Sequence, residues 1–235
     1  MTLRAHLFVS ALILQAAVIS SAFAEEALPK GKIYVTSWFS NAINIVDPAQ
    51  GKMIGSVKVG AHNHNVALTP DQTQAWVTNN NAGTVSVIDT ATDQVAATIP
   101  VGTGPRHTFF SSDGMEAYVT NEFDDTVTEV DTARQRVSNT IPVGMMPHFV
   151  LVLGERIFVT NFGGRSVTVA SRRLGETLAI VNVGVGPLGA SATRDGSRVY
   201  VACHTSNTVA VIDTVTLKLV DEIRTEAGPV QASVA

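Results

Sequence analysis

Short runs of β-branched and apolar residues recur along the chain, and each is followed by turn-forming residues. Two of them, 84–89 (TVSVID) and 208–213 (TVAVID), alternate in part between apolar and polar positions, as half-buried strands do. Pairs such as Asp113-Gly114 and Asp131-Thr132 separate the runs and are typical of tight turns. The pattern therefore predicts an all-β chain of strands joined by short turns.

One tetrapeptide recurs five times and marks an internal repeat. Its copies read YVTS, WVTN, YVTN, FVTN and YVAC, begin at residues 34, 76, 118, 158 and 200, and are spaced by 42, 42, 40 and 42 residues. The same order of strand and turn signals surrounds each copy, so each unit should hold four strands. The fourth strand carries, at one shared position, Lys58, Pro100, Pro142, Asn182 and Arg224. Because proline or charge protects an exposed edge, we expect strand four to be outermost.

The tetrapeptides and the Asp-Thr turns resemble the YVTN β-propeller repeat family, and the resemblance covers essentially all of residues 31–235. It implies four-stranded antiparallel blades, usually seven, arranged radially around a central channel. The chain is also similar to lactonase-like, haem d1-like and nitrous oxide reductase-like propeller domains. Five repeats depart from the usual count, but propellers of four to eight blades are known.

The two ends of the chain predict how five blades would close. The first repeat begins directly before its second strand and lacks a first one, whereas residues 228–235 match the first-strand segment 104–110. We therefore expect a five-bladed β-propeller in which the C-terminal strand completes the N-terminal blade. A fragment of a longer propeller would end at the same phase of the repeat, and this alternative stays open.

Residues 1–24 have the pattern of a secretory signal peptide. Arg4 and His6 precede an apolar run, 7–19, and Ala22-Phe23-Ala24 forms a small-residue cleavage site. The run is too short to span a bilayer, and no cysteine near the cleavage point offers a lipid attachment site. We expect a periplasmic or secreted protein with a single propeller domain over residues 25–235.

Composition narrows the classes of partner. Removing Arg4 with the signal leaves 15 basic and 20 acidic side chains, a net charge of −5 with histidine neutral. That charge suits a soluble monomer and argues against general nucleic-acid binding, which needs a basic surface. Cys203 is the only cysteine, so no intrachain disulfide forms. We expect this thiol to be a buried packing residue rather than a reactive one.

The candidate chemistry gathers on one predicted face. With strand one innermost, the loops from strand four to strand one and from strand two to strand three emerge on the same side of each blade. Every histidine of the mature chain lies in these loops or at the start of strand one. The predicted ligand-binding residues are His62, His64, Arg106, His107, His148, His204, Trp38, Phe162 and Glu122. The opposite face has uniform Ser/Thr-x-Asp-Gly and Asp-Thr turns, for which local hydrogen bonding is a sufficient explanation.

A metal site is one interpretation of this face. Histidine is a common transition-metal ligand, and the Met145-Met146 thioethers would add softness suited to copper. The candidate ligands are His62, His64 and His148, for copper or another divalent metal. The sequence contains no motif with a spacing typical of metal ligands, so it does not establish a cofactor.

Binding of a small acidic ligand, or of a protein or peptide partner, is the interpretation we favour. Arg106 and the nearby imidazoles would hold an anionic group, and aromatic loop residues would add apolar contact. An enzyme, such as a lactonase-like hydrolase, is the alternative, and it would pair Glu122 or Asp124 with His107 or His148. The sequence has no nucleophile signature, so we assign no catalytic residue. An inert scaffold with unrelated loop side chains stays open as well.

Overall fold

A computed structural model describes residues 31–234 of the chain. The predicted signal peptide lies outside these residues. The described part contains nineteen β-strands and one short 3₁₀ helix, η1 (Asn80–Ala82). No helix in it is long and apolar enough to cross a membrane. The all-β prediction is confirmed.

The strands fall into five antiparallel sheets, one for each repeat. The first contains β1 (Ile33–Val35), β2 (Ala42–Asp47) and β3 (Lys52–Lys58). The second contains β4 (Asn63–Leu68), β5 (Gln74–Asn79), β6 (Thr84–Asp89) and β7 (Gln94–Pro100). The third contains β8 (Pro105–Phe110), β9 (Glu116–Asn121), β10 (Thr126–Asp131) and β11 (Arg136–Pro142).

The last two sheets repeat this order. The fourth contains β12 (Pro147–Leu153), β13 (Arg156–Asn161), β14 (Ser166–Ser171) and β15 (Thr177–Asn182). The fifth contains β16 (Pro187–Ala192), β17 (Arg198–Cys203), β18 (Thr208–Asp213) and β19 (Lys218–Arg224). Each of the last four sheets is four-stranded in sequence order, which confirms the predicted blades.

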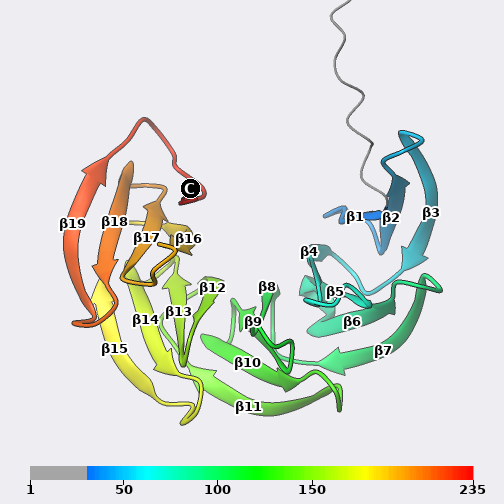
Figure 1. Cartoon of the computed structure of the whole chain (residues 1–235), viewed down its shortest axis with the longest axis horizontal. Coiled ribbons are helices and arrows are strands. Elements are labelled where there is room, and N and C mark those ends of the chain that lie inside the picture. The colour runs from blue at the N-terminus through cyan, green and yellow to red at the C-terminus, as the bar shows by residue number, and fades with distance from the viewer. Residues whose placement is uncertain (1–30, 235) are drawn as a thin grey trace, which may run out of the picture.

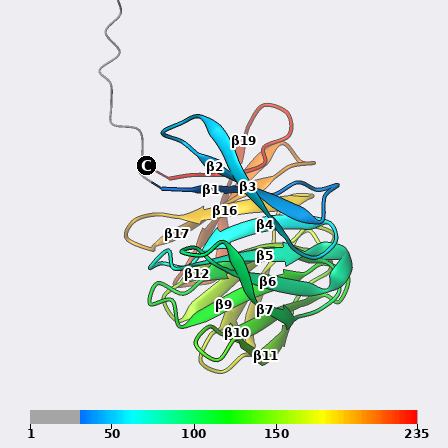
Figure 2. The same ribbon diagram turned by 90° about the vertical axis from the view of Figure 1, so that its right-hand side faces the viewer.

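The blades follow one another along an open arc (Figure 1). The first strand of each complete blade lies on the concave inner side, and the fourth strand lies on the outer rim, as predicted. In the view turned by 90° the blades appear as stacked sheets (Figure 2). The inner strands β4, β8, β12 and β16 are therefore neighbours in space, and they bring residues about 40 positions apart to one surface.

The predicted closure by the C-terminal strand is not formed in this structure. The first sheet has three strands, and residues 225–234 form no strand. The C-terminal segment instead lies beside its own blade, where Gly189 N donates to Val230 O at 3.0 Å. The physical reason is visible in Figure 1: the rotation from blade to blade is too small for five blades to bring the first and last sheets together.

The tetrapeptide builds the core because its aromatic position packs between successive sheets. Trp76, Tyr118 and Phe158 are fully or almost fully buried. The Trp76 ring meets that of Phe110, from the next blade, edge-on at 5.3 Å between centroids. Such contacts remove apolar surface from water on both sides of each sheet, and this burial holds the blades to one another.

In the second, third and fourth blades, the asparagine of the tetrapeptide ties together one end of the blade. Asn121 Nδ2 donates to Thr126 Oγ1 at 3.0 Å and to Thr128 Oγ1 at 2.8 Å. The backbone of Gly102 passes so close that a Cβ there would lie 2.5 Å from the Asn121 side chain. The glycine that follows strand four is thus needed for close approach to the buried asparagine.

Candidate functional site

The two predicted loop classes lie together on one face, because backbone hydrogen bonds join them within each blade. Glu122 N, after the second strand of its blade, donates to Gly104 O, before the first, at 3.0 Å. Phe162 N donates to Met146 O at the same distance. We call the inner end of this face the mouth: the first residues of β4, β8 and β12 with the loops 36–41, 59–62, 101–104, 122–125, 143–146 and 162–165.

The inner strands begin with a β-bulge, and this bulge carries the residues of the mouth. In the third blade Pro105 pairs with Asn121 and Thr108 pairs with Val119, so Arg106 and His107 both lie opposite Thr120. A bulge of this kind frees backbone groups from the ladder and redirects side chains. Both residues of the pair can thereby face the mouth, whereas regular alternation would send one to each side.

The threonine of the tetrapeptide compensates for the missing ladder bonds. His107 N donates to Thr120 Oγ1 at 3.1 Å, and Thr120 Oγ1 donates to His148 O, in the next blade, at 3.0 Å. Thr78 makes the equivalent bridge from Asn65 N to Arg106 O, at 2.9 and 2.8 Å. One buried hydroxyl therefore fixes the bulge in its own blade and the start of the next, which sets the relative position of neighbouring histidines.

An ion pair lies in the middle of the mouth. Arg106 Nε and Nη2 donate to Glu122 Oε2 and Oε1 at 2.5 and 2.8 Å, a bidentate arrangement. The side chains are 22% and 8% exposed, so the pair is largely withdrawn from water. The Arg106 guanidinium carbon also lies 5.6 Å from the centre of the Trp38 ring, within range of a cation–π interaction. Arg106 is thus held by a neighbouring loop and is already neutralised.

His64 connects the ion pair to the other histidines. Its Nδ1 lies 3.1 Å from the carbonyl oxygen of Arg106, and its Nε2 lies 3.0 Å from Arg106 Nη1. A carbonyl only accepts and a guanidinium only donates, so Nδ1 carries the hydrogen and Nε2 presents a lone pair. These two contacts suit the neutral imidazole and fix its tautomer.

His64, His107 and His148 form a cluster, which we call the histidine cluster. One ring nitrogen of each lies within 4.8 Å of the others, and all three side chains are partly buried. The ring centres of His107 and His148 are 4.9 Å apart, and those of His64 and His107 are 5.1 Å apart. Nδ1 of His148 is buried and has no hydrogen-bond partner among the described residues.

The environment of the histidine cluster opposes protonation. Burial, followed by the charges of neighbouring imidazoles and Arg106, lowers the pKa of His107 to about 3. Burial, followed by the charge of Arg106, lowers the pKa of His148 to about 4. The pKa of His64 is lowered by the same two causes, against a smaller raising effect of Glu122. At neutral pH the histidine cluster is therefore uncharged.

We expect acid to destabilise the fold through the histidine cluster. In the unfolded chain these imidazoles protonate near their ordinary pKa of 6.5, whereas His107 in the folded chain does so only near 3. Between these values the unfolded state binds more protons, so stability is full above pH 6.5 and declines as pH falls. Each such histidine contributes a slope of up to about 1.4 kcal/mol per pH unit.

Urea unfolding of chelator-treated protein between pH 7.5 and 4.5 measures this slope. His107→Gln should flatten it. An unchanged slope in His107→Gln would mean that the imidazole is not withdrawn from water in the folded state.

The structure separates the predicted site residues into two groups. His64, Arg106, His107, His148, Glu122 and Trp38 come together in the mouth, and Phe162 lies beside them with its ring centre 6.5 Å from that of His148. His62 and His204 lie apart from the histidine cluster. The His62 ring instead packs against Trp38 at 5.7 Å, and His204 is exposed in the loop of the last blade.

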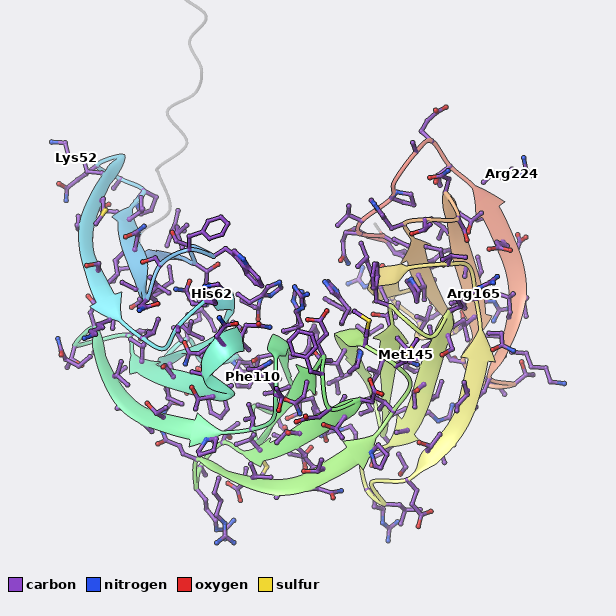
Figure 3. The ribbon with its side chains drawn as sticks, turned by 180° about the vertical axis from the view of Figure 1, so that it is seen from behind. Lys52, His62, Phe110, Met145, Arg165 and Arg224 are labelled. Atoms are coloured by element: carbon purple, nitrogen blue, oxygen red, sulfur yellow. The ribbon has the colours of Figure 1, made fainter. Side chains whose placement is uncertain are left out.

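The predicted metal trio differs from the one that the fold assembles. The sequence predicted His62, His64 and His148 as metal ligands. In the structure, His64 and His148 lie next to His107 in the histidine cluster, and His62 is not part of it. The cause is the bulge, which turns both Arg106 and His107 toward the mouth. Figure 3 shows His62 and Met145 toward the inner side of the arc, from two different blades, and Lys52 and Arg224 at its outer ends.

The carboxylates proposed for acid–base chemistry have other partners. Glu122 accepts from Arg106, and Asp124 Oδ2 accepts from Thr103 N at 2.6 Å. Among residues 31–234, neither carboxylate forms a hydrogen bond with His107 or His148. Cys203 is fully buried, and burial raises the pKa of its thiol, in keeping with a packing role.

Comparison with known proteins agrees with the fold. A family model described as "Lactonase, 7-bladed beta-propeller" matches residues 46–183, which include the histidine cluster and the Arg106–Glu122 pair. The chain is similar to a solved structure of Kuenenia stuttgartiensis hydrazine synthase, with a TM-score of 0.61 and 17% sequence identity over 91% of this chain and 92% of that one. At this identity the likeness concerns the fold alone. No curated protein matches the chain.

Proposed function

The chain belongs to the lactonase family of 7-bladed β-propellers, and on this fold we propose that it is an exported binding or scaffold module whose ligand or partner site is the mouth. Export rests on the signal-like residues 1–24 and gives a periplasmic or secreted location. A monomer that binds no nucleic acid fits the net negative charge of the chain.

The observation that carries this proposal is the apolar rim around a buried polar centre. Phe39 is 92% exposed, Phe123 is 62% exposed, and Trp38 and Met145 are also exposed, all from loops of the mouth. Large apolar side chains exposed together on a soluble protein mark a contact surface. A polar centre with an aromatic border is the usual anatomy of such a site.

The ligand that best fits is a small acid or an acidic peptide with an apolar part. Aromatic side chains supply the apolar contact at low entropic cost. Of the five N–H groups of Arg106, two are used by Glu122 and one by His64, which leaves two for a ligand. Because Glu122 neutralises the guanidinium, the protein side chains can give hydrogen bonds to a bound anion. They supply little net positive charge.

Hydrolysis of a lactone is the second candidate function, and the observation that supports it is the match to the lactonase family model. A general base for water would need an imidazole oriented by a carboxylate. Glu122 and Asp124 are engaged with Arg106 and the Thr103 backbone instead. Fold kinship does not transfer an activity, so binding has the stronger support.

A screen with matched surface variants tests the binding proposal. The probes are lactones, aromatic carboxylic acids and short acidic peptides; binding is measured by calorimetry for every variant, and also by Trp38 fluorescence for the chains that keep this residue. For a probe that binds, the double variant Trp38→Ala, Phe123→Ala should bind about thirtyfold more weakly. This corresponds to a loss of about 2 kcal/mol of binding free energy from the apolar contacts.

The control changes two apolar residues on the opposite face that are at least as exposed, Met115→Ala and Leu174→Ala. These variants should bind the probe as the unchanged chain does. Equal losses in both pairs would place the site elsewhere, and measurable lactone turnover that depends on the mouth would favour the enzyme.

A further inference from the structure

The histidine cluster draws its members from three successive blades. His64 is on β4, His107 on β8 and His148 on β12, and among residues 31–234 these form the one group of three or more potential metal-binding side chains within ligand range of one another. The three histidines are therefore brought together by the packing of separate blades, and not because they are neighbours on one strand. Threonine hydroxyls hold all three positions: Thr120 bonds to the backbone of His107 and His148, and Thr36 Oγ1 donates to His64 O at 3.2 Å.

The spacing of the three nitrogens suits a single metal ion. Three points within 4.8 Å of one another all lie within about 2.8 Å of a common point, and zinc–imidazole bonds are about 2.0–2.1 Å long. Movements of about 1 Å or less in each side chain would close that difference. Rotation about the side-chain torsions supplies such movement without disturbing the strands.

We propose that His64, His107 and His148 bind one divalent transition-metal ion of the kind that prefers imidazole, Zn²⁺ or Cu²⁺, with a coordination position left open toward the mouth. The inference deepens the proposed function and rests on it in one respect: the ion would supply the positive charge for an acidic ligand that the neutralised Arg106 does not. Three imidazoles with an open position is an established arrangement for such ions.

His64 is oriented as a metal-ligating histidine usually is. Its Nδ1–H donates to the carbonyl oxygen of Arg106 at 3.1 Å, which directs the Nε2 lone pair away from that strand. Metal-bound histidines commonly donate their other ring nitrogen to a carbonyl or carboxylate, and this fixes the ring. The backbone that carries the histidine cluster therefore also provides the outer contact for one of its members.

A cationic group already lies at the predicted ligand atom. Arg106 Nη1 donates to His64 Nε2 at 3.0 Å, whereas the bond to Glu122 uses Nε and Nη2. Because the guanidinium is a rigid plane, Nη1 keeps its place while Glu122 holds Nε and Nη2, so the His64 ring turns its Nε2 from Nη1 toward the ion when one binds. The guanidinium would then stand next to the open coordination position, where its free N–H groups meet a bound carboxylate.

His148 gives a second, independent indication. Its Nδ1 is buried and has no partner among the described residues, and a buried polar atom without a partner costs free energy. Coordination, or a hydrogen bond formed when the ring turns to coordinate through its other nitrogen, would remove this cost. Burial also keeps the rings of the histidine cluster uncharged, which is the form of imidazole that binds metal ions.

Metal binding to the tag-free chain tests the proposal directly. Protein stripped with a chelator is titrated with ZnCl₂ and with CuCl₂ at pH 7, and bound metal is measured by calorimetry and elemental analysis. We expect one ion per chain, and a Cu²⁺ electron paramagnetic resonance spectrum with splitting from imidazole nitrogens. His107→Ala and His148→Ala should each weaken binding at least about tenfold, and the triple variant with His64→Ala should abolish it.

His62→Ala and His204→Ala are the matched controls, because they remove histidines of the same face outside the histidine cluster. Both should keep the stoichiometry and affinity of the unchanged chain. His107→Gln and His148→Gln retain hydrogen-bonding capacity, and circular dichroism checks that each variant is folded. The Cu²⁺ spectrum of the unchanged chain gives a result even where a variant does not fold.

The proposal is overturned if the unchanged chain binds no stoichiometric metal, if the spectrum lacks nitrogen splitting, or if the control variants lose as much affinity as the cluster variants. Failure of the proposed function looks different. Metal that binds while none of the acidic probes does would leave the metal site standing and remove its role in ligand binding. A probe that binds equally with and without metal would contradict that role and leave the mouth as a binding site.

Discussion

Arg106→Ala is expected to lower the free energy of unfolding by about 3 kcal/mol, because it leaves the Glu122 carboxylate withdrawn from water without its partner. Glu122 is only 8% exposed, and both of its oxygens accept from the guanidinium. The substitution also removes the donor to His64 Nε2. Denaturant unfolding at pH 7 measures the change. From the place of Arg106 at the start of a strand alone, one would expect folding hardly to respond.

A double-mutant cycle separates the ion pair from general effects of truncation. Adding Glu122→Gln to Arg106→Ala removes the unpaired charge, so the double variant should be more stable than Arg106→Ala alone. Arg134→Ala breaks an ion pair with Asp131 of the same 2.5 Å length, but the Arg134 side chain is 68% exposed. Its effect should stay below about 1 kcal/mol. Equal effects of Arg106→Ala and Arg134→Ala would mean that the mouth is open to water.

Tyr118→Ala is expected to destabilise the chain by about 3–5 kcal/mol through lost burial and the cavity that it leaves. Tyr118 is fully buried and packs with Val150 and Ile157 of the next blade. The damage should therefore affect the contact between two blades rather than one strand. Thermal and denaturant unfolding give the magnitude, and metal binding by protein that remains folded should be little changed.

Tyr118→Phe is the matched control, because it keeps the ring and removes only the hydroxyl. That hydroxyl donates to Glu116 Oε2 at 3.0 Å and accepts from Arg172 Nε at 3.2 Å. Its loss should cost about 1 kcal/mol, the usual net value of a hydrogen bond. If Tyr118→Ala cost no more than Tyr118→Phe, the core between these blades would be less tightly packed than the structure indicates.

The sequence predicts the blades because local signals define them. Each tetrapeptide has an aromatic first position, the three middle copies add a threonine and an asparagine, and each copy occurs where the second strand of a repeat is expected. Proline or charge on the fourth strand correctly indicated the outer edge, since that strand has no neighbour within its sheet on one side. Strand order follows from the short turns, which leave consecutive strands no alternative but to pair.

Closure could not be predicted in this way, because it depends on the rotation between blades. That rotation is the sum of many side-chain contacts such as those of Trp76 with Phe110, and no single repeat encodes it. The match between residues 228–235 and the first-strand segment 104–110 is real in the sequence. The segment nonetheless lies beside β16, because the first blade is not within its reach.

The face of the candidate site followed from topology, but its detailed composition did not. Alternation along a regular strand would turn Arg106 and His107 to opposite sides, and only the bulge opposite Thr120 turns both to the mouth. The pairing of Arg106 with Glu122 depends on how two loops approach, which spacing along the chain does not specify. His62 lies two residues from His64, yet it packs against Trp38 outside the histidine cluster.

We propose that three imidazoles from three blades act together as one ligand-holding group in the mouth. X-ray diffraction from crystals of the chain grown with Zn²⁺, recorded on both sides of the zinc absorption edge, tests it most directly. We expect one strong anomalous peak about 2.0–2.1 Å from a ring nitrogen of each of His64, His107 and His148. A zinc peak bound elsewhere, at His62 or His204 for example, with none among these three rings, would contradict it.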